Sequence, residues 1–246
     1  MSECKPVTTP MSSTTSLSLK DDTPLVDATL YRQVLGKLQY LSFTRLDISF
    51  AVNKLSQFMH APTQTHWSLV KQLLRYLQYT KNHGLQITSK THPRLFVYSD
   101  ADWAGDINDK NSTSGYILYL GANPIIWSSK KQRTVARFSA EAEYRAVASA
   151  LAEVNWVQKL LVELHVQLPY PPIIYCDNVG APYLCQNPVL HSRMKHIEVD
   201  FHFVKRSSAA KTGASSALTC CRSARGHAYK AFASSTSSTS VQVNGY

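Results

Sequence analysis

The chain has 246 residues, 44% hydrophobic and 17% charged, so it is long enough to bury a sizeable core and too apolar to be disordered throughout. Its 26 basic and 16 acidic residues give a formal net charge of +10, which points to a polyanionic partner such as nucleic acid. The sequence has neither an apolar leader nor the run of about 18–20 apolar residues that a membrane span needs. Five cysteines without a C-x-x-C pair disfavour a zinc or disulfide scaffold, and we expect an intracellular protein with no membrane partner.

The positive charge is concentrated at the end of the chain. All 16 acidic residues precede Lys205, and the residues before it carry a net charge of only +4. From Lys205 onwards there are six basic residues and no acid. More than half of the net charge therefore belongs to this tail, and the total is a weak indicator of a nucleic-acid site.

The first third of the sequence predicts a disordered lead-in and a small helical block. Residues 1–27 are rich in Ser, Thr and Pro and show no hydrophobic period, which is typical of an extended or disordered segment. Apolar residues then recur at three- and four-residue steps, which predicts helices over 28–44, 50–59 and 64–80. We treat 28–81 as one all-α block.

The next part of the chain predicts an α/β domain over residues 92–206. Short runs of β-branched, aromatic and aliphatic residues predict four strands, at 95–98, 116–120, 125–127 and 173–176. A long helical segment is expected over 140–165 between the third and fourth strands, with Ser139 as its N-cap. Short helices are expected after Asn178 and over 194–205. This order predicts a mixed sheet with helices.

The tail over residues 207–246 has a different composition. Ser, Thr and Ala dominate it, it contains no acid, and it shows little apolar periodicity. We expect this segment to be of low complexity and disordered.

Three acidic residues are the candidate catalytic and metal-binding residues. Asp100 lies at the end of the first predicted strand, Glu143 lies one turn into the long helix, and Asp177 directly follows the fourth strand. An acid at the end of a buried strand is costly unless it is paired or binds a cation. Carboxylate oxygens are the ligands that Mg²⁺ prefers, and two such ions can hydrolyse a phosphodiester. Each acid also has an ordinary structural alternative, as a turn residue, a solvated helix residue or a helix cap, and only their combination is specific.

Several segments of the sequence resemble the polyproteins of copia-type retrotransposons. Residues 98–106 read YSDADWAGD, residues 112–116 STSGY, residues 139–144 SAEAEY and residues 176–178 CDN. These motifs are similar to those of the ribonuclease H domain in that family. Residues 31–52 resemble the end of the reverse transcriptase that precedes it. The resemblance covers roughly residues 5–206.

The resemblance implies a ribonuclease H-like mixed sheet flanked by helices, which cuts the RNA strand of an RNA–DNA hybrid with two Mg²⁺ or Mn²⁺ ions. Asp100, Glu143 and Asp177 match the first three of the family's four catalytic acids. Glu141 fits less well, because it lies at the helix start, where it complements the helix dipole. Asp102 is a secondary ligand candidate, since it shares a strand face with Asp100 if the strand continues. The remainder of the polyprotein is the expected partner in an intact element.

The sequence departs from the family in two places. No acid follows Asp200, so the fourth catalytic carboxylate is missing, and we expect the last strand and the last helix to be missing as well. Glu198 or Asp200 are alternatives for that ligand, although exposed acids on an amphipathic helix are the simpler interpretation. The Tyr-x-Asp-Asp polymerase signature is also absent. Residues 28–81 therefore resemble only the end of a reverse transcriptase and cannot polymerise.

Candidate nucleic-acid contacts lie between the third strand and the long helix. The basic residues of this segment are Lys130, Lys131, Arg133 and Arg137. A solvated basic loop is the ordinary interpretation, and their proximity to Glu143 makes phosphate contacts an equal alternative. Trp103 and Trp127 are candidates for stacking on sugars or bases, although core packing is the more common role of Trp. A zinc site built from His191, His196 and His202 is disfavoured, since no cysteine pair accompanies them.

Two functions follow from the sequence. The first is a ribonuclease H-like domain of a retroelement polyprotein, in which the loss of one ligand makes the activity of this copy doubtful. The alternative is a degenerate fragment without catalysis, which binds nucleic acid non-specifically through its basic tail.

Overall fold

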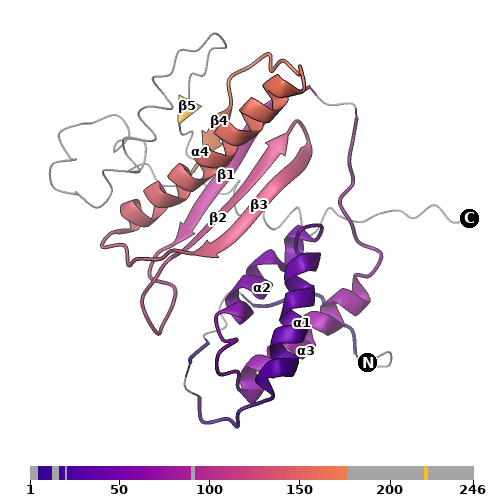
Figure 1. Cartoon of the computed structure of the whole chain (residues 1–246), viewed down its shortest axis with the longest axis vertical. Coiled ribbons are helices and arrows are strands. Elements are labelled where there is room, and N and C mark those ends of the chain that lie inside the picture. The colour runs from indigo at the N-terminus through magenta and orange to yellow at the C-terminus, as the bar shows by residue number, and fades with distance from the viewer. Residues whose placement is uncertain (1–4, 13–16, 20, 90–91, 177–218, 221–246) are drawn as a thin grey trace, which may run out of the picture. The chain divides into compact units, whose positions relative to one another are not determined.

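The computed structural model describes residues 5–12, 17–19, 21–89, 92–176 and 219–220 (Figure 1). The chain forms two compact units. The first is built mainly on Met1–Gln86 and the second on Ile87–Asp106 and Lys110–Phe232.

The first unit is helical, as predicted. The first two helices each end three residues before the predicted position, at Leu41 and Ser56. After Leu41 the backbone turns, and the carbonyl oxygen of Leu41 accepts hydrogen bonds from the N–H groups of Thr44 and Arg45. Asp27 is the N-cap of this helix and accepts a hydrogen bond from the N–H of Thr29. The elements are α1 (Ala28–Leu41), the short 3₁₀ helix η1 (Leu46–Ile48), α2 (Ser49–Ser56) and α3 (Gln64–Tyr79).

Part of the lead-in belongs to the core of the first unit. The sequence predicts disorder over 1–27, but Met11 and Leu17 are buried among the apolar side chains of the three helices. The backbone of the lead-in is also held, because the N–H of Val26 donates to the carbonyl of Pro62 and the N–H of Gln64 donates to that of Pro24. Two isolated apolar residues form no periodic pattern, so composition alone did not reveal this packing.

A buried polar network ties the loop after α1 to the end of α3. The guanidinium of Arg45 lies 2.6 Å from the carboxylate of Asp47 and donates to both the carbonyl and the hydroxyl of Thr80. The hydroxyl of Tyr76 donates to the same carboxylate at 2.7 Å. Every member of the network is thus hydrogen-bonded, as buried polar groups need to be.

The second unit contains the mixed sheet that the sequence predicts. Its first three strands form an antiparallel meander, and β4 pairs parallel with β1. The strand order is β3-β2-β1-β4-β5, so β1 lies at the centre. The strands are β1 (Leu95–Asp102), β2 (Thr113–Leu120), β3 (Asn123–Lys131), β4 (Ile173–Tyr175) and β5 (Thr219–Cys220).

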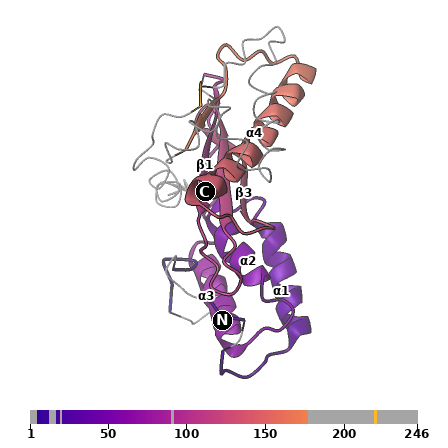
Figure 2. The same ribbon diagram turned by 90° about the vertical axis from the view of Figure 1, so that its left-hand side faces the viewer.

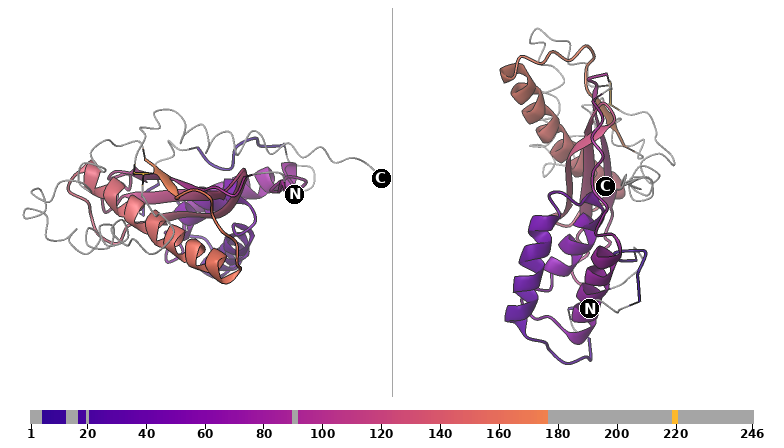
Figure 3. Two further views of the ribbon diagram at one scale, coloured as in Figure 1. Left: turned by 90° about the horizontal axis from the view of Figure 1, so that it is seen from above. Right: turned by 90° about the vertical axis from the view of Figure 1, so that its right-hand side faces the viewer.

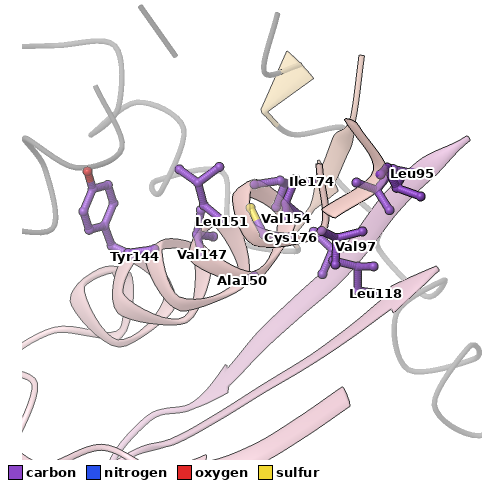
Figure 4. Packing of buried hydrophobic residues seen from close by; sticks show 13 residues of the cluster. Leu95, Val97, Leu118, Tyr144, Val147, Ala150, Leu151, Val154, Ile174 and Cys176 are labelled. Carbon is purple, nitrogen blue, oxygen red and sulfur yellow. The ribbon is translucent and has the colours of Figure 1, made fainter. Parts of the chain in front are cut away.

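One long helix, α4 (Ser139–Glu163), packs against one face of this sheet (Figure 2). Its apolar side chains, including Val147 and Leu151, meet Val97 of β1 and Ile174 of β4 in a continuous core (Figure 4). No helix in the described part of the chain is long and apolar enough to cross a membrane.

The start of α4 differs from the prediction. Phe138 and not Ser139 is the N-cap, and Ser139 already lies within the helix. Phe138 is the N-cap because its carbonyl accepts the N–H of Ala142, and no side chain caps the helix. The carboxylate of the buried Glu141 instead accepts a hydrogen bond from the N–H of Arg137, just ahead of the helix, at 2.8 Å.

The edge of the sheet beyond β4 holds a very short strand. Thr219 and Cys220 pair in parallel with Ile173 and Ile174 (Figures 1 and 3). They come from the segment over 207–246, which the sequence predicts to be disordered, and the rest of that segment lies outside the described residues. The same holds for the short helices expected after Asn178 and over 194–205.

We predict that Asp47→Asn destabilises the first unit in a pH-dependent way. Burial alone would raise the pKa of Asp47, but hydrogen bonds from Arg45 and Tyr76 outweigh burial and hold the pKa below its ordinary value. Leaving Arg45 without its buried partner is expected to cost about 3–5 kcal/mol at neutral pH. A lowered carboxyl pKa adds stability above the unfolded-state value of about 4, and this stability is lost as the pH falls through the folded-state pKa.

Thermal unfolding followed by circular dichroism, from neutral pH down to about pH 3, tests this expectation. The difference in unfolding temperature between the wild type and Asp47→Asn should become smaller as the pH falls. The exposed residue Asp22 provides the control, since Asp22→Asn should change little at any pH. If the difference in unfolding temperature is as large at about pH 3 as at neutral pH, a stabilising role of the ionised carboxylate is contradicted.

Candidate functional site

Asp100 lies in the second half of the central strand β1. The strand extends to Asp102, four residues further than the sequence predicts, because its polar end continues to pair with β2 and Asp100 lies opposite Gly115. Leu95, Val97 and Ser99 are buried, whereas Asp100 is exposed. The backbone ladder, and not the composition of the segment, thus holds this acid in an ordered position.

Glu143 lies on the helix that covers β1. It lies in the second turn of α4 and is only 6% exposed. The next residue, Tyr144, belongs to the apolar core shared by α4 and the sheet. Because a buried carboxylate is costly without compensation, Glu143 is not an ordinary solvated helix residue. This placement removes the main structural alternative for this residue.

The third candidate, Asp177, lies outside the described residues. Tyr98 of β1 pairs with Tyr175 of β4. In the sequence, Asp100 lies two positions after Tyr98, and Asp177 lies two positions after Tyr175. The other acids and histidines considered as ligands, Glu198, Asp200, His191, His196 and His202, also lie outside them. Within the described ranges, no group of three or more His, Cys, Asp or Glu side chains could hold a metal ion. The donor chemistry of Asp100 and Glu143 fits Mg²⁺, and the predicted set needs Asp177 to complete it.

Asp102, the secondary ligand candidate, is the exposed last residue of β1. A Cβ atom placed on Gly105 would overlap the carboxylate of Asp102, which shows how closely that carboxylate lies against the backbone. The turn also needs an unusual conformation at Ala104, whose φ is 54°. Because β1 continues to Asp102, this residue lies on the same strand face as Asp100, and it stays a secondary ligand candidate.

Two polar residues at the end of β3 make an ion pair and hydrogen bonds within the protein. Lys131 lies 2.7 Å from the carboxylate of Asp106, which is 3% exposed. The side-chain amide of Gln132 donates to the hydroxyl of Ser114 and to the carbonyl of Ala142, each at 2.9 Å. Gln132 thus links β2 to the start of α4. Lys131, one of the four basic residues predicted to contact nucleic acid, is thus paired with an acid of the same chain.

The other three predicted contacts are exposed. Lys130 lies on β3, and Arg133 and Arg137 lie in the loop between β3 and α4. This loop is called the β3–α4 loop below and comprises residues 132–138. The exposure of these three side chains leaves them available to phosphates.

A buried ion pair that the sequence did not reveal fixes the β3–α4 loop. Glu141 is 2% exposed, and its carboxylate lies 2.6 Å from the guanidinium of Arg145, one helical turn further along. Arg145 also donates to the carbonyl and the hydroxyl of Thr134, at 2.8 Å and 2.7 Å. The spacing of four residues was visible in the sequence. What the sequence could not show was that the pair is buried and bonded to a loop ahead of the helix.

Trp103 is more exposed than its residue type suggests. Its side chain is 51% exposed, so core packing, the common role of Trp, does not apply. Its indole N–H donates to the carbonyl of Ala136 at 3.1 Å, which joins the turn after β1 to the β3–α4 loop. Trp127, the other stacking candidate, lies on β3 and is half-buried.

No family model matches the chain, but individual relatives are similar to it. Two retrovirus-related Pol polyproteins of Arabidopsis thaliana, from the transposons RE1 and RE2, are 58% and 57% identical to it over 205 residues, or 83% of this chain. The chain spans only 14% of the length of either relative. Among solved structures, LC11-RNase H1, isolated from compost, is similar with a TM-score of 0.36 and 15% identity, over 53% of this chain and 84% of that one. Family membership therefore rests on the sequence relatives.

We predict that Gly105→Ala disturbs the turn after β1. The new methyl group would displace the carboxylate of Asp102, and because that side chain is exposed and can turn towards solvent, the cost should be less than about 1 kcal/mol. Thermal unfolding measures the loss. Gly84→Ala is the matched control, because a Cβ there meets no atom within 4 Å. The double variant Gly105→Ala with Asp102→Ala should regain part of the stability, and the absence of any rescue would contradict the close approach of the Asp102 carboxylate to Gly105.

We predict that Glu141→Gln loosens the β3–α4 loop. Gln keeps the shape of the side chain but loses the charge that holds Arg145, which should cost about 1.5–3 kcal/mol. Amide hydrogen exchange should also become faster at Arg137, whose N–H donates to this carboxylate. Glu163→Gln, an exposed change on the same helix, is the control. Unchanged exchange at Arg137 in the Glu141→Gln variant would rule out this role of the ion pair.

Proposed function

Because this chain belongs to the Pol polyproteins of copia-type retrotransposons, whose ribonuclease H domain its second unit resembles, we propose that this unit hydrolyses the RNA strand of RNA–DNA hybrids. The observation that carries the proposal is the position of two acids. Asp100 lies on the central strand β1, and the buried Glu143 lies near the start of the helix that covers this strand. The first unit is proposed to be the end of the preceding reverse transcriptase.

The proposed chemistry depends on carboxylates that stay ionised. Asp100 and Glu143, together with Asp177, would hold divalent ions, with Mg²⁺ or Mn²⁺ as the expected metals. Two such ions, when bound, activate a water molecule and stabilise the leaving oxygen of a phosphodiester. The contribution of this chain is to place hard oxygen ligands on two rigid elements, a central strand and the helix packed on it.

Substrate contacts are proposed for the exposed basic residues next to this site. Lys130, Arg133 and Arg137 would contact phosphates, because a hybrid of A-form shape is recognised through its backbone and 2′-hydroxyls. Lys131 contributes less to this contact while it is paired with Asp106. Removing one phosphate contact lowers the salt dependence of binding.

A second function, non-catalytic binding, is supported by the sequence after Asp200. This segment contains no acid that could be the fourth catalytic carboxylate. A fragment that has lost this ligand would keep its basic residues and bind nucleic acid without cutting it. In an intact element the remainder of the polyprotein would supply its partner domains, since this chain spans 14% of its relatives.

We predict that the chain cleaves a labelled RNA–DNA hybrid in the presence of Mg²⁺ or Mn²⁺, and that Asp100→Asn abolishes the cleavage. Loss of a metal-binding carboxylate at a hydrolytic centre is expected to lower the rate by at least about 100-fold. Glu143→Gln should have the same effect, and a chelator should reproduce it in the wild type. Gel separation of the labelled RNA measures the rate.

Glu163→Gln is the matched control, because it makes the same change on the exposed end of the same helix. It should cleave like the wild type. Hybrid binding without cleavage above the Asp100→Asn level would exclude the catalytic proposal and favour the non-catalytic fragment.

A further inference from the structure

A fully buried histidine, His66, lies at the start of α3 in the first unit. Its exposed fraction is 0%, and it occupies the third position of the helix, after the N-cap Thr63. Its Nδ1 accepts a hydrogen bond from the N–H of Thr63 at 3.1 Å. The hydroxyl of Thr63 accepts from the N–H of His66 in return, so the two residues form a reciprocal capping box. The imidazole is thus used here as a hydrogen-bond acceptor.

The capping box needs the neutral form of this imidazole. A ring nitrogen accepts a hydrogen bond only when it carries no proton, so acceptance at Nδ1 places the one proton of the neutral ring on Nε2. The imidazolium carries a proton on both nitrogens and cannot accept from Thr63. The ring of His66 also stacks on Phe58 of α2, with the two centroids 4.1 Å apart, and a charge in such apolar surroundings is costly. Protonation of His66 therefore opposes the packing of this helix start.

Burial determines the protonation of His66. It lowers the pKa of the imidazole below its ordinary value, and it outweighs the Asp21 carboxylate and the backbone of Ser18, which both favour the charged form. Asp21 faces the ring from the lead-in, whereas Phe58, which faces it from α2, has no charge. Hydrogen bonds, first of all from Thr23, lower the pKa of Asp21 to about 2. Asp21 therefore keeps its charge between about pH 7 and pH 5, and His66 is the group that titrates there.

The lead-in is bonded to the same helix start. The hydroxyl of Thr63 donates to the carboxylate of Asp21 at 2.8 Å. The N–H of Gln64, the first residue of α3, donates to the carbonyl of Pro24 at 2.9 Å. The first N–H groups of a helix have no partner within the helix, so the lead-in supplies an acceptor that α3 itself lacks. Opening of the capping box would therefore loosen the lead-in as well.

We propose that His66 is a pH-sensitive latch, whose protonation breaks the capping box with Thr63 and releases residues 21–26 from the start of α3. When the latch is open the ring meets water, and its pKa is then about 6.5. The pKa with the latch closed is lower. The latch is therefore closed above about pH 6.5 and opens as the pH falls through the lower value. It acts independently of the proposed function and needs neither metal nor nucleic acid.

The test is amide hydrogen exchange of the full chain between about pH 7 and pH 5, followed by NMR and corrected for the intrinsic pH dependence of exchange. Protection of the N–H groups of Thr63 and Gln64 should fall severalfold towards pH 5. The upper limit is about 25-fold, which a pKa of about 6.5 in the open form sets. Protection at the buried residues Val70 and Leu73, further along α3, should stay the same, because only the helix start opens.

His66→Gln is the variant that separates protonation from packing. A Gln at the third position of a helix also accepts from the N–H of the N-cap residue, so it keeps the capping box but gains no proton in this pH range. In this variant the amides of Thr63 and Gln64 should be as well protected at about pH 5 as at about pH 7. His60→Gln is the matched control, because His60 is exposed and its loss should leave the pH dependence of the wild type intact.

Three outcomes would overturn the proposal. The first is wild-type protection of Thr63 and Gln64 that does not change with pH, and the second is the same loss of protection in His66→Gln. The third is an equal loss at Val70 and Leu73, which would show unfolding of the whole helix. If His66→Gln does not fold, NMR titration of the His66 ring in the wild type takes its place. A measured pKa below about 6.5 supports the latch, and one at or above this value contradicts it.

Discussion

The second unit depends on how it compensates the carboxylates buried at the start of α4. A charge taken from water into a protein interior must be balanced, and Glu141 is balanced by Arg145. That pair also sets the position of the β3–α4 loop, because Arg145 reaches Thr134 and Glu141 holds the N–H of Arg137. Glu143, two residues further on, is thus presented from a helix start whose surroundings are already fixed. The acid that fixes the loop, Glu141, and the proposed metal ligand, Glu143, thus lie in the same helical turn.

The parts of the fold that the sequence predicted are those governed by local periodicity. The three helices of the first unit and the four main strands of the second lie where their apolar patterns indicated, but β1 continues to Asp102, β2 begins at Thr113 and β3 continues to Lys131. These polar extensions have no apolar pattern and are held by pairing with the neighbouring strand. Likewise, the proposed roles of Asp100 and Glu143 rest on the order of several motifs, since each acid alone has an ordinary alternative.

The remaining features depend on contacts between distant residues. Trp103 and Ala136 are separated by 33 positions, and Asp106 and Lys131 by 25, so no spacing rule connects them. Met11 and Leu17 are buried because the helical core has room for them, although the segment itself shows no period. The roles of Glu141 and Arg145 fall between these cases, because the sequence shows their spacing but not their burial.

The strand order has a consequence for solubility. β3 forms an outer edge of the sheet, where an unpaired backbone invites the addition of a strand from another molecule. Pro124 lies at the start of this strand, a register irregularity interrupts its pairing with β2, and Lys130 is exposed near its end. Proline, irregular pairing and lysine are the means by which natural sheets keep their edges from joining. Within the described residues, the β3 edge of the sheet therefore carries three features that disfavour the addition of a strand from another molecule.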